Sequence, residues 1–197
     1  MKTPITFLCL IFGASAFHTL HSADTKTAVF GAGCFWCVEA FYEALPGVVD
    51  VVSGYAGGTE PDPKYKDVAR GRTSHAEVVQ VTWDPEKTSY SELVEFFWTT
   101  HDVTNPDGVW PDFGSQYRSI ILYASPEQKE TAEASKAALE ASGQLEKPVA
   151  TEIVPLQTFY LAEPYHQDYA KRNPRDRYVV NIAVPKLKKL GLLEKGG

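Results

Sequence analysis

The sequence contains few cysteines and, beyond its first residues, no long apolar segment. Only three of the 197 residues are cysteine, which excludes a small domain cross-linked by a network of disulfides. No apolar run after the N-terminus is long enough to cross a bilayer as a helix. Glycine-rich phosphate-binding fingerprints, internal repeats and low-complexity tracts are also missing. We therefore look for chemistry carried by the chain's own side chains.

Positive charge is also scarce. The chain has 25 acidic residues against 19 lysines and arginines, a formal net charge of −6 at neutral pH. This balance argues against binding to nucleic acid or to anionic membrane surfaces. We expect no nucleic-acid partner, no stable membrane insertion and a monomer.

The first 23 residues have the pattern of a secretory signal peptide. Lys2 forms a basic start, residues 5–17 are apolar but too short for a membrane span, and small residues follow. We expect cleavage after Ala23, with the A-x-A at residues 14–16 as a competing site; a buried N-terminal strand or helix is the alternative. Residues 24–197 then form one exported domain, periplasmic if the source has two membranes.

Strand and helix patterns alternate along this domain. Strands are expected at residues 27–30, 48–55, 75–83, 117–124 and 149–156, and helices at residues 34–45, 89–101, 125–143 and 162–174. Ser89 with Glu92 forms a capping box, and Ser125 begins the third helix. We expect an α/β (or α+β) domain with a mixed sheet covered by helices and a tail that is mostly irregular after Pro174.

The stretch GCFWC, residues 33–37, raises the question of why two cysteines stand three positions apart. Cys34 is expected as the first residue of a helix, after a tight turn at residues 31–33. The unpaired amides and the helix dipole there favour an anion, which predicts a lowered thiol pKa and a nucleophilic Cys34. Cys37 lies one turn later on the same face, so one sulfur can react and the other can resolve the product.

Other interpretations of this pair are open: a structural bridge within the helix, two buried thiols, or part of a metal site. A structural bridge across so short a loop would stabilise weakly, because it removes little chain entropy. A zinc site needs about two further ligands, and His75, His101 and His166 form no ligand-spaced pair. We expect no metal and no bound cofactor.

Several other residues could form an apolar pocket with a proton donor around the cysteine pair. Phe35 and Trp36 can wall a pocket suited to a thioether methyl group, or can be core residues. Glu77 shares a strand face with apolar residues, which predicts a raised pKa; an edge-strand glutamate facing solvent is the alternative. Tyr65 and Tyr117, in polar loops, can donate hydroxyl hydrogen bonds to a substrate oxygen, or be structural.

Four stretches, in order, resemble the peptide methionine sulfoxide reductases of the A type. They are GCFWCVEAFYEALPGVVDVVSGYAGG, YKDVARGRTSHAEVVQVTWDP, HDVTNPD with DFGSQYRSIIL, and EPYHQDYAKRNP. The resemblance extends from about Ala28 to about Leu190. It implies a two-layer sandwich of ferredoxin-like type with long loops, and reduction of the S epimer of methionine sulfoxide, free or in proteins, as repair of oxidative damage.

The resemblance also implies roles for named residues. Cys34 attacks the sulfoxide sulfur and becomes a sulfenic acid, and Glu77 protonates the oxygen. Tyr65 and Tyr117 hydrogen-bond that oxygen. Phe35 and Trp36 hold the methyl group on the substrate sulfur. Asp112 matches an acidic residue that helps to build the pocket.

One departure from the family pattern concerns Cys37. Many members have glycine at this position and carry their resolving cysteines near the C-terminus, where this chain has none. If resolution occurs within the chain, it forms a Cys34–Cys37 disulfide, which an external dithiol must reopen. The expected partner is thioredoxin or a thioredoxin-like protein, besides the oxidised proteins and peptides.

Two rival functions fit part of this pattern. An exported dithiol-disulfide oxidoreductase explains the export signal and the cysteine pair, but not Glu77 or the tyrosines. A non-catalytic binding module with a structural Cys34–Cys37 bridge predicts that loss of Cys34 changes stability alone.

Overall fold

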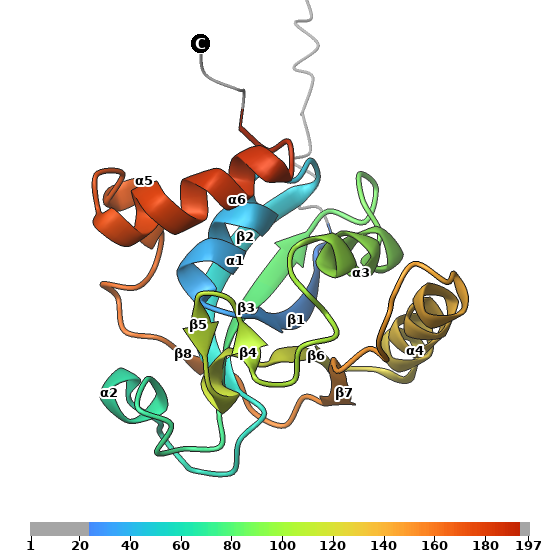
Figure 1. Ribbon diagram of the computed structural model, residues 1–197, viewed down its shortest axis with the longest axis horizontal. Coiled ribbons are helices and arrows are strands. Elements are labelled where there is room, and N and C mark those ends of the chain that lie inside the picture. The colour runs from blue at the N-terminus through green and yellow to red at the C-terminus, as the bar shows by residue number, and fades with distance from the viewer. Residues whose placement is uncertain (1–23, 194–197) are drawn as a thin grey trace, which may run out of the picture.

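The core of the protein is a six-stranded mixed sheet with strand order β7-β6-β1-β3-β2-β8 (Figure 1). The computed structural model describes residues 24–193, so the expected signal peptide lies outside the described residues. The strands are β1 (Lys26–Ala32), β2 (Val48–Ala56), β3 (Ala76–Trp83), β6 (Ser119–Tyr123), β7 (Glu152–Pro155) and β8 (Tyr160–Leu161). Strands β6 and β7 pair in parallel, and the other neighbours are antiparallel.

Six helices and a small hairpin complete the described fold. The helices are α1 (Phe35–Glu43), α2 (Tyr65–Val68), α3 (Tyr90–Thr99), α4 (Pro126–Ala141), α5 (Tyr169–Arg172) and α6 (Val184–Lys189). The hairpin pairs β4 (Gly108–Val109) with β5 (Asp112–Phe113). The units β1-α1-β2 and β3-α3-β6 place their strands in the order β6-β1-β3-β2. This split arrangement is the ferredoxin-like topology that the resemblance implied.

The sheet has two covered faces. Helices α1, α3 and α4 cover one face of the sheet. Their apolar side chains form a single buried cluster with strand residues of that face, among them Phe30 and Val79. On the opposite face, the neighbouring strand residues Val29 and Val78 are covered by a segment that includes Phe159. The alternation of strand residues between two buried faces therefore fixes which side chains of β1 and β3 can reach α1.

The predicted helix starts are confirmed. The Ser89 hydroxyl accepts the Glu92 N–H at 3.2 Å, and the Glu92 carboxylate accepts the Ser89 N–H at 2.8 Å. Ser125 accepts the N–H of Gln128 in the same way at the start of α4.

The expected turn at residues 31–33 is shorter in the structure. Strand β1 continues through Ala32 because Gly31 pairs with Ile120 on β6, and a side chain at Gly31 would meet that isoleucine at 2.7 Å. The turn is confined to Gly33, whose φ of 92° favours glycine. Cys34 is therefore the N-cap of α1, one residue before the helix begins.

The expectation of a mostly irregular tail is wrong. A π-helical turn, η2 (Val179–Ala183), leads directly into α6, and Figure 1 shows this segment lying against α1. Its apolar side chains, among them Val179 and Leu187, pack on Cys37 and Phe41. The expected helix at residues 162–174 contracts to α5 because the preceding Asp168 has a left-handed φ of 53°. Among residues 24–193, no helix combines the length and apolarity needed to span a membrane.

Candidate active site

Two free thiols lie at the start of α1. Cys34 caps the helix directly after the Gly33 turn and is 8% exposed, whereas Cys37 is 2% exposed. The Cys37 N–H donates to the Cys34 carbonyl at 3.0 Å, which fixes one tight turn between the two residues. Both sulfurs therefore lie at one end of the sheet, where β1 delivers the chain to α1.

The predicted lowering of the Cys34 pKa is wrong for the free protein. Burial raises the pKa of the Cys34 thiol well above its usual range, and the charges of Glu77 and Cys37 raise it further. The local effect of the helix N-terminus is smaller than the cost of removing a thiolate from water. Cys34 is therefore a thiol rather than a thiolate in the free protein.

Glu77, on β3, lies directly beside this helix start. Its side chain is 1% exposed, and its Oε2 accepts the backbone N–H of Phe35 at 3.1 Å. Burial raises the pKa of Glu77 to about 8, against the opposing effect of the Phe35 hydrogen bond. The buried apolar face predicted for Glu77 is confirmed, and the carboxyl is mostly protonated at neutral pH.

An aromatic wall adjoins Cys34. Phe35 is fully buried, whereas Trp36 is half-buried and stacks on Tyr169 with ring centroids 3.6 Å apart. The Trp36 indole N–H donates to Nδ1 of His166 at 3.0 Å. Since Nδ1 accepts and burial lowers the pKa of His166, its neutral ring carries the proton on Nε2.

Sequence reasoning did not assign His166 and Tyr169 to the pocket. The sequence offers His166 only as a candidate metal ligand and gives no local signal for Tyr169. Both follow the β8 strand by a short irregular segment, so their approach to Trp36 depends on contacts between distant parts of the chain.

Tyr65 and Tyr117 approach the same centre from two separate segments. Tyr65 begins α2 and stacks on Phe35 with ring centroids 6.5 Å apart. Burial, followed by the charges of Glu77 and Cys34, raises the pKa of Tyr65 to about 12. The same causes, in the same order, raise the pKa of Tyr117 in the 3-10 turn η1 (Ser115–Tyr117). Both hydroxyls therefore stay protonated and can donate hydrogen bonds.

Asp112, on β5, meets a residue that sequence reasoning missed. Its Oδ2 accepts the hydroxyl proton of Tyr178, which immediately precedes η2. The Cys37 thiol in turn donates to the Tyr178 oxygen at 3.8 Å. The apolar spacing of Val179, Ala183 and Leu187 was the available signal for a helix here, although not for this contact.

Almost the whole described chain matches one protein family. A family model described as peptide methionine sulfoxide reductase matches residues 26–193. The chain belongs to the peptide methionine sulfoxide reductase family. Peptide methionine sulfoxide reductase MsrA of Natronomonas pharaonis is 50% identical over 163 residues, which are 83% of this chain and 92% of the relative.

Solved structures agree with this reductase family. Mxr1 of Saccharomyces cerevisiae in reduced form is 36% identical, with a TM-score of 0.71 over 79% of this chain and 89% of that one. The same yeast protein in complex with Trx2 is 28% identical, with a TM-score of 0.51 over 76% and 87% of the two chains. The expected α/β fold and the expected reductase family are both confirmed.

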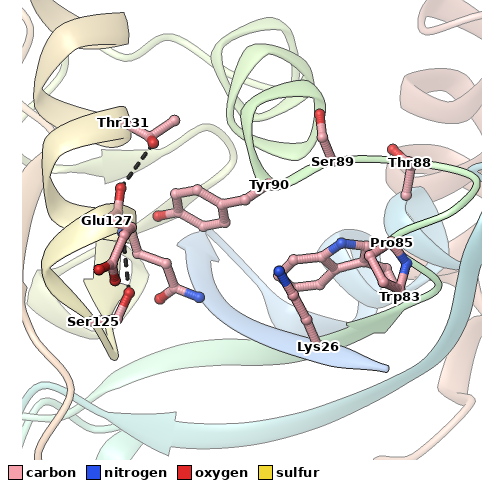
Figure 2. A pocket seen from close by; sticks show the side chains of 10 residues that line it. Lys26, Trp83, Pro85, Thr88, Ser89, Tyr90, Ser125, Glu127 and Thr131 are labelled. Atoms are coloured by element: carbon pink, nitrogen blue, oxygen red, sulfur yellow. Dashed lines mark hydrogen bonds between the residues drawn. The ribbon is translucent and has the colours of Figure 1, made fainter. Parts of the chain in front are cut away.

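A separate cavity lies at the opposite end of β1 and β3 from Cys34 and Glu77 (Figure 2). It has a volume of about 490 Å³, and its lining includes Lys26 and Trp83. Figure 2 shows Tyr90 directed from α3 toward Glu127 at the start of α4. Because Cys34 and Glu77 lie at the other strand ends, this cavity is separate from the two thiols. Within the described part of the chain, no cluster of three or more His, Cys, Asp or Glu side chains could hold a metal ion.

Proposed function

We propose that this protein reduces methionine S-sulfoxide, free or within proteins, to methionine, with Cys34 as nucleophile and Glu77 as proton donor. The observation that carries the proposal is the 3.1 Å hydrogen bond from the Phe35 N–H to Glu77. This bond holds the Glu77 carboxyl, which is mostly protonated at neutral pH, against Phe35, the residue that follows Cys34. Membership of the reductase family supports the reaction class.

The first chemical step converts Cys34 to a sulfenic acid. Glu77 donates its proton to the sulfoxide oxygen, whose hydrogen bonds come from Tyr65 and Tyr117. The Cys34 sulfur attacks the substrate sulfur while its own proton returns to the Glu77 carboxylate. The S–O bond of the substrate breaks, the hydroxyl passes to Cys34, and methionine leaves. The substrate sulfur is reduced, the Cys34 sulfur is oxidised, and Glu77 is protonated again.

The substrate methyl group is held by aromatic side chains in this proposal. Phe35 and Trp36 form the apolar wall beside Cys34, and a thioether packs well on such faces. The Trp36–His166 hydrogen bond and the stacking on Tyr169 fix the indole before the substrate arrives. Asp112 helps to shape the pocket through Tyr178.

The sulfenic acid is resolved by Cys37, one turn along α1. Attack by the Cys37 sulfur forms a Cys34–Cys37 disulfide and releases water. A thioredoxin-like dithiol then reopens the disulfide. The complex of the yeast relative Mxr1 with Trx2 supports a reductant of this class.

We further propose export of the enzyme and repair of oxidised proteins outside the cytosol. The support is the order of basic start, apolar run and small residues in the first 23 positions. In a bacterium with two membranes, the compartment is the periplasm, and the reductant is a thioredoxin-like protein that acts there.

The test is a product assay on the two epimers of a blocked methionine sulfoxide with dithiothreitol. We expect loss of the S epimer only, and none with the Cys34→Ser variant. Reduction of neither epimer by folded protein would overturn the proposal. A scrambled-disulfide assay on the same protein would then test the rival exchange activity.

A further inference from the structure

We propose that Tyr178, backed by Asp112, is the proton acceptor for Cys37 when Cys37 attacks the Cys34 sulfenic acid. This inference rests on the proposed function, because it assigns a catalytic group to its resolving step. It gives the segment after Pro174, which contains Tyr178 and no cysteine, a role in the chemistry.

Three side chains form a continuous hydrogen-bonded path. The Cys37 thiol donates to the Tyr178 oxygen at 3.8 Å, and the Tyr178 hydroxyl donates to Oδ2 of Asp112. They come from α1, from the residue that precedes η2 and from β5, so three distant parts of the chain meet here. The donor directions all run from the sulfur to the carboxylate, which is the direction in which a proton must leave Cys37.

The tyrosine is held in place from two sides. Its backbone N–H donates to Oδ1 of Asp176 at 2.8 Å, which fixes the chain before η2. Its ring meets the Trp36 indole edge-on, with centroids 5.8 Å apart. The hydroxyl therefore reaches Cys37 in a fixed orientation, as a proton acceptor must.

Cys37 needs such an acceptor because it is buried as a thiol. Burial raises the pKa of Cys37 to about 11, whereas the thiolate is the attacking species. Of the charged groups around it, Lys186 favours the thiolate, and Asp112 and Glu77 disfavour it. Without a local acceptor, only a small fraction of Cys37 would be reactive near neutral pH.

The resolving step balances with the groups present. The Cys37 sulfur forms a bond to the Cys34 sulfur as the S–OH bond breaks. The Cys37 proton passes to the Tyr178 oxygen while the Tyr178 proton passes to Asp112, and the leaving hydroxide takes the proton of Glu77 to become water. The Cys37 sulfur is oxidised and the Cys34 sulfur is reduced. Asp112 later returns its proton to solvent, and Glu77 regains one.

The test is Tyr178→Phe in a single turnover without external reductant. Methionine and the trapped sulfenic acid report the first step, and loss of both thiols reports the disulfide. We expect methionine to reach about one equivalent, while the disulfide forms at least ~10-fold more slowly than in the parent and the sulfenic acid accumulates. Tyr123→Phe, a hydroxyl deletion on β6, is the matched control and should leave disulfide formation unchanged.

The pH dependence separates proton transfer from a structural role. With Tyr178 present, disulfide formation should change little between pH 6 and 8. In Tyr178→Phe, it should rise roughly tenfold per pH unit, because only free thiolate then reacts below the Cys37 pKa. Asp112→Asn should shift the rate in the same direction and provides the test if the phenylalanine variant does not fold.

Disulfide formation at the parent rate in either variant would overturn the inference, as would a rate of disulfide formation that does not change with pH in both variants. In either case, methionine production would leave the proposed reductase function standing. Absence of methionine from the parent protein itself would instead contradict the proposed function.

Discussion

The backbone N–H of Phe35 donates to the Glu77 carboxyl at 3.1 Å, so the carboxyl that we propose as proton donor is held against the first residue of the helix that Cys34 caps. This bond spans 42 positions of sequence and joins β3 to α1. It keeps the Glu77 carboxyl beside Cys34, in a buried place that favours the protonated form over the charged carboxylate. The N-terminus of α1 thereby holds both Cys34 and, through the Phe35 N–H, the Glu77 carboxyl of β3.

Replacement of Glu77 by glutamine should remove the proton donor while keeping the shape and the acceptor for the Phe35 N–H. We expect the first-turnover rate of methionine formation to fall by about 10²–10⁴, the usual contribution of general acid catalysis. Rapid-quench measurement of methionine gives this rate. Glu86→Gln, on the exposed turn after β3, is the control, and an equal loss in both variants would contradict the assignment.

The same rate should depend on pH through Glu77. Since the pKa of Glu77 is raised to about 8, its protonated form predominates below pH 8 and is lost above it. With Cys34 reacting from its thiol, we expect a first-turnover rate that is level from pH 6 to 7.5 and falls above pH 8. A rate that keeps rising through pH 9 would mean that thiolate formation at Cys34 controls the step instead.

Cys37→Ser should separate the first turnover from recycling. The variant keeps Cys34 and Glu77, so we expect about one equivalent of methionine per enzyme. Turnover with thioredoxin should then stop, because no disulfide can form within the chain, while dithiothreitol should still support reduction. Sustained thioredoxin-driven turnover by this variant would refute Cys37 as the resolving thiol.

Local patterns predicted those parts of the site that depend on one element. The period of two along β3 placed Glu77 on the buried face, and the capping box placed the start of α3 at Ser89. The ferredoxin-like arrangement came from the family resemblance, because strand order is not encoded in any one segment.

The remaining features depend on contacts between distant segments. Tyr178 reaches Cys37 across 141 positions, and His166 reaches Trp36 across 130. The predicted thiolate at Cys34 failed for the same reason, since the helix start is a local feature whereas burial is produced by the whole fold. Pairings and pKa values of this kind require the packed structure.

Trp36→Phe should weaken substrate binding more than it slows chemistry. Phenylalanine keeps an aromatic face but loses the hydrogen bond to His166, a loss worth about 1 kcal/mol. We expect KM for a methionine sulfoxide peptide to rise roughly fivefold, with a smaller change in kcat. Steady-state kinetics with dithiothreitol measures both. An unchanged KM with a large fall in kcat would mean that the indole acts on the reacting atoms rather than on binding.

We expect Glu39, which lies on the face of α1 toward β2, to make the stability of the protein depend on pH. This effect is separate from catalysis. Its side chain is 1% exposed, and burial raises its pKa to about 7. Because the folded pKa lies above the unfolded value of about 4.3, ionisation of Glu39 adds no cost below pH 4, where the carboxyl is protonated in both states. The free energy of unfolding falls as pH rises from there toward 7, as the unfolded chain releases a proton that the folded chain retains.

Glu39→Gln should remove this penalty. At pH 8 we expect the variant to be more stable than the parent by about 1–3 kcal/mol, with little difference at pH 4. Urea unfolding at the two pH values measures the change, and the contribution of Glu77, present in both proteins, cancels in the comparison. Glu86→Gln, which alters an exposed carboxyl, should show no such pH-dependent gain. A Glu39→Gln protein that is less stable than the parent at pH 8 would mean that the ionised carboxylate is stabilised by its neighbours on β2 and α5.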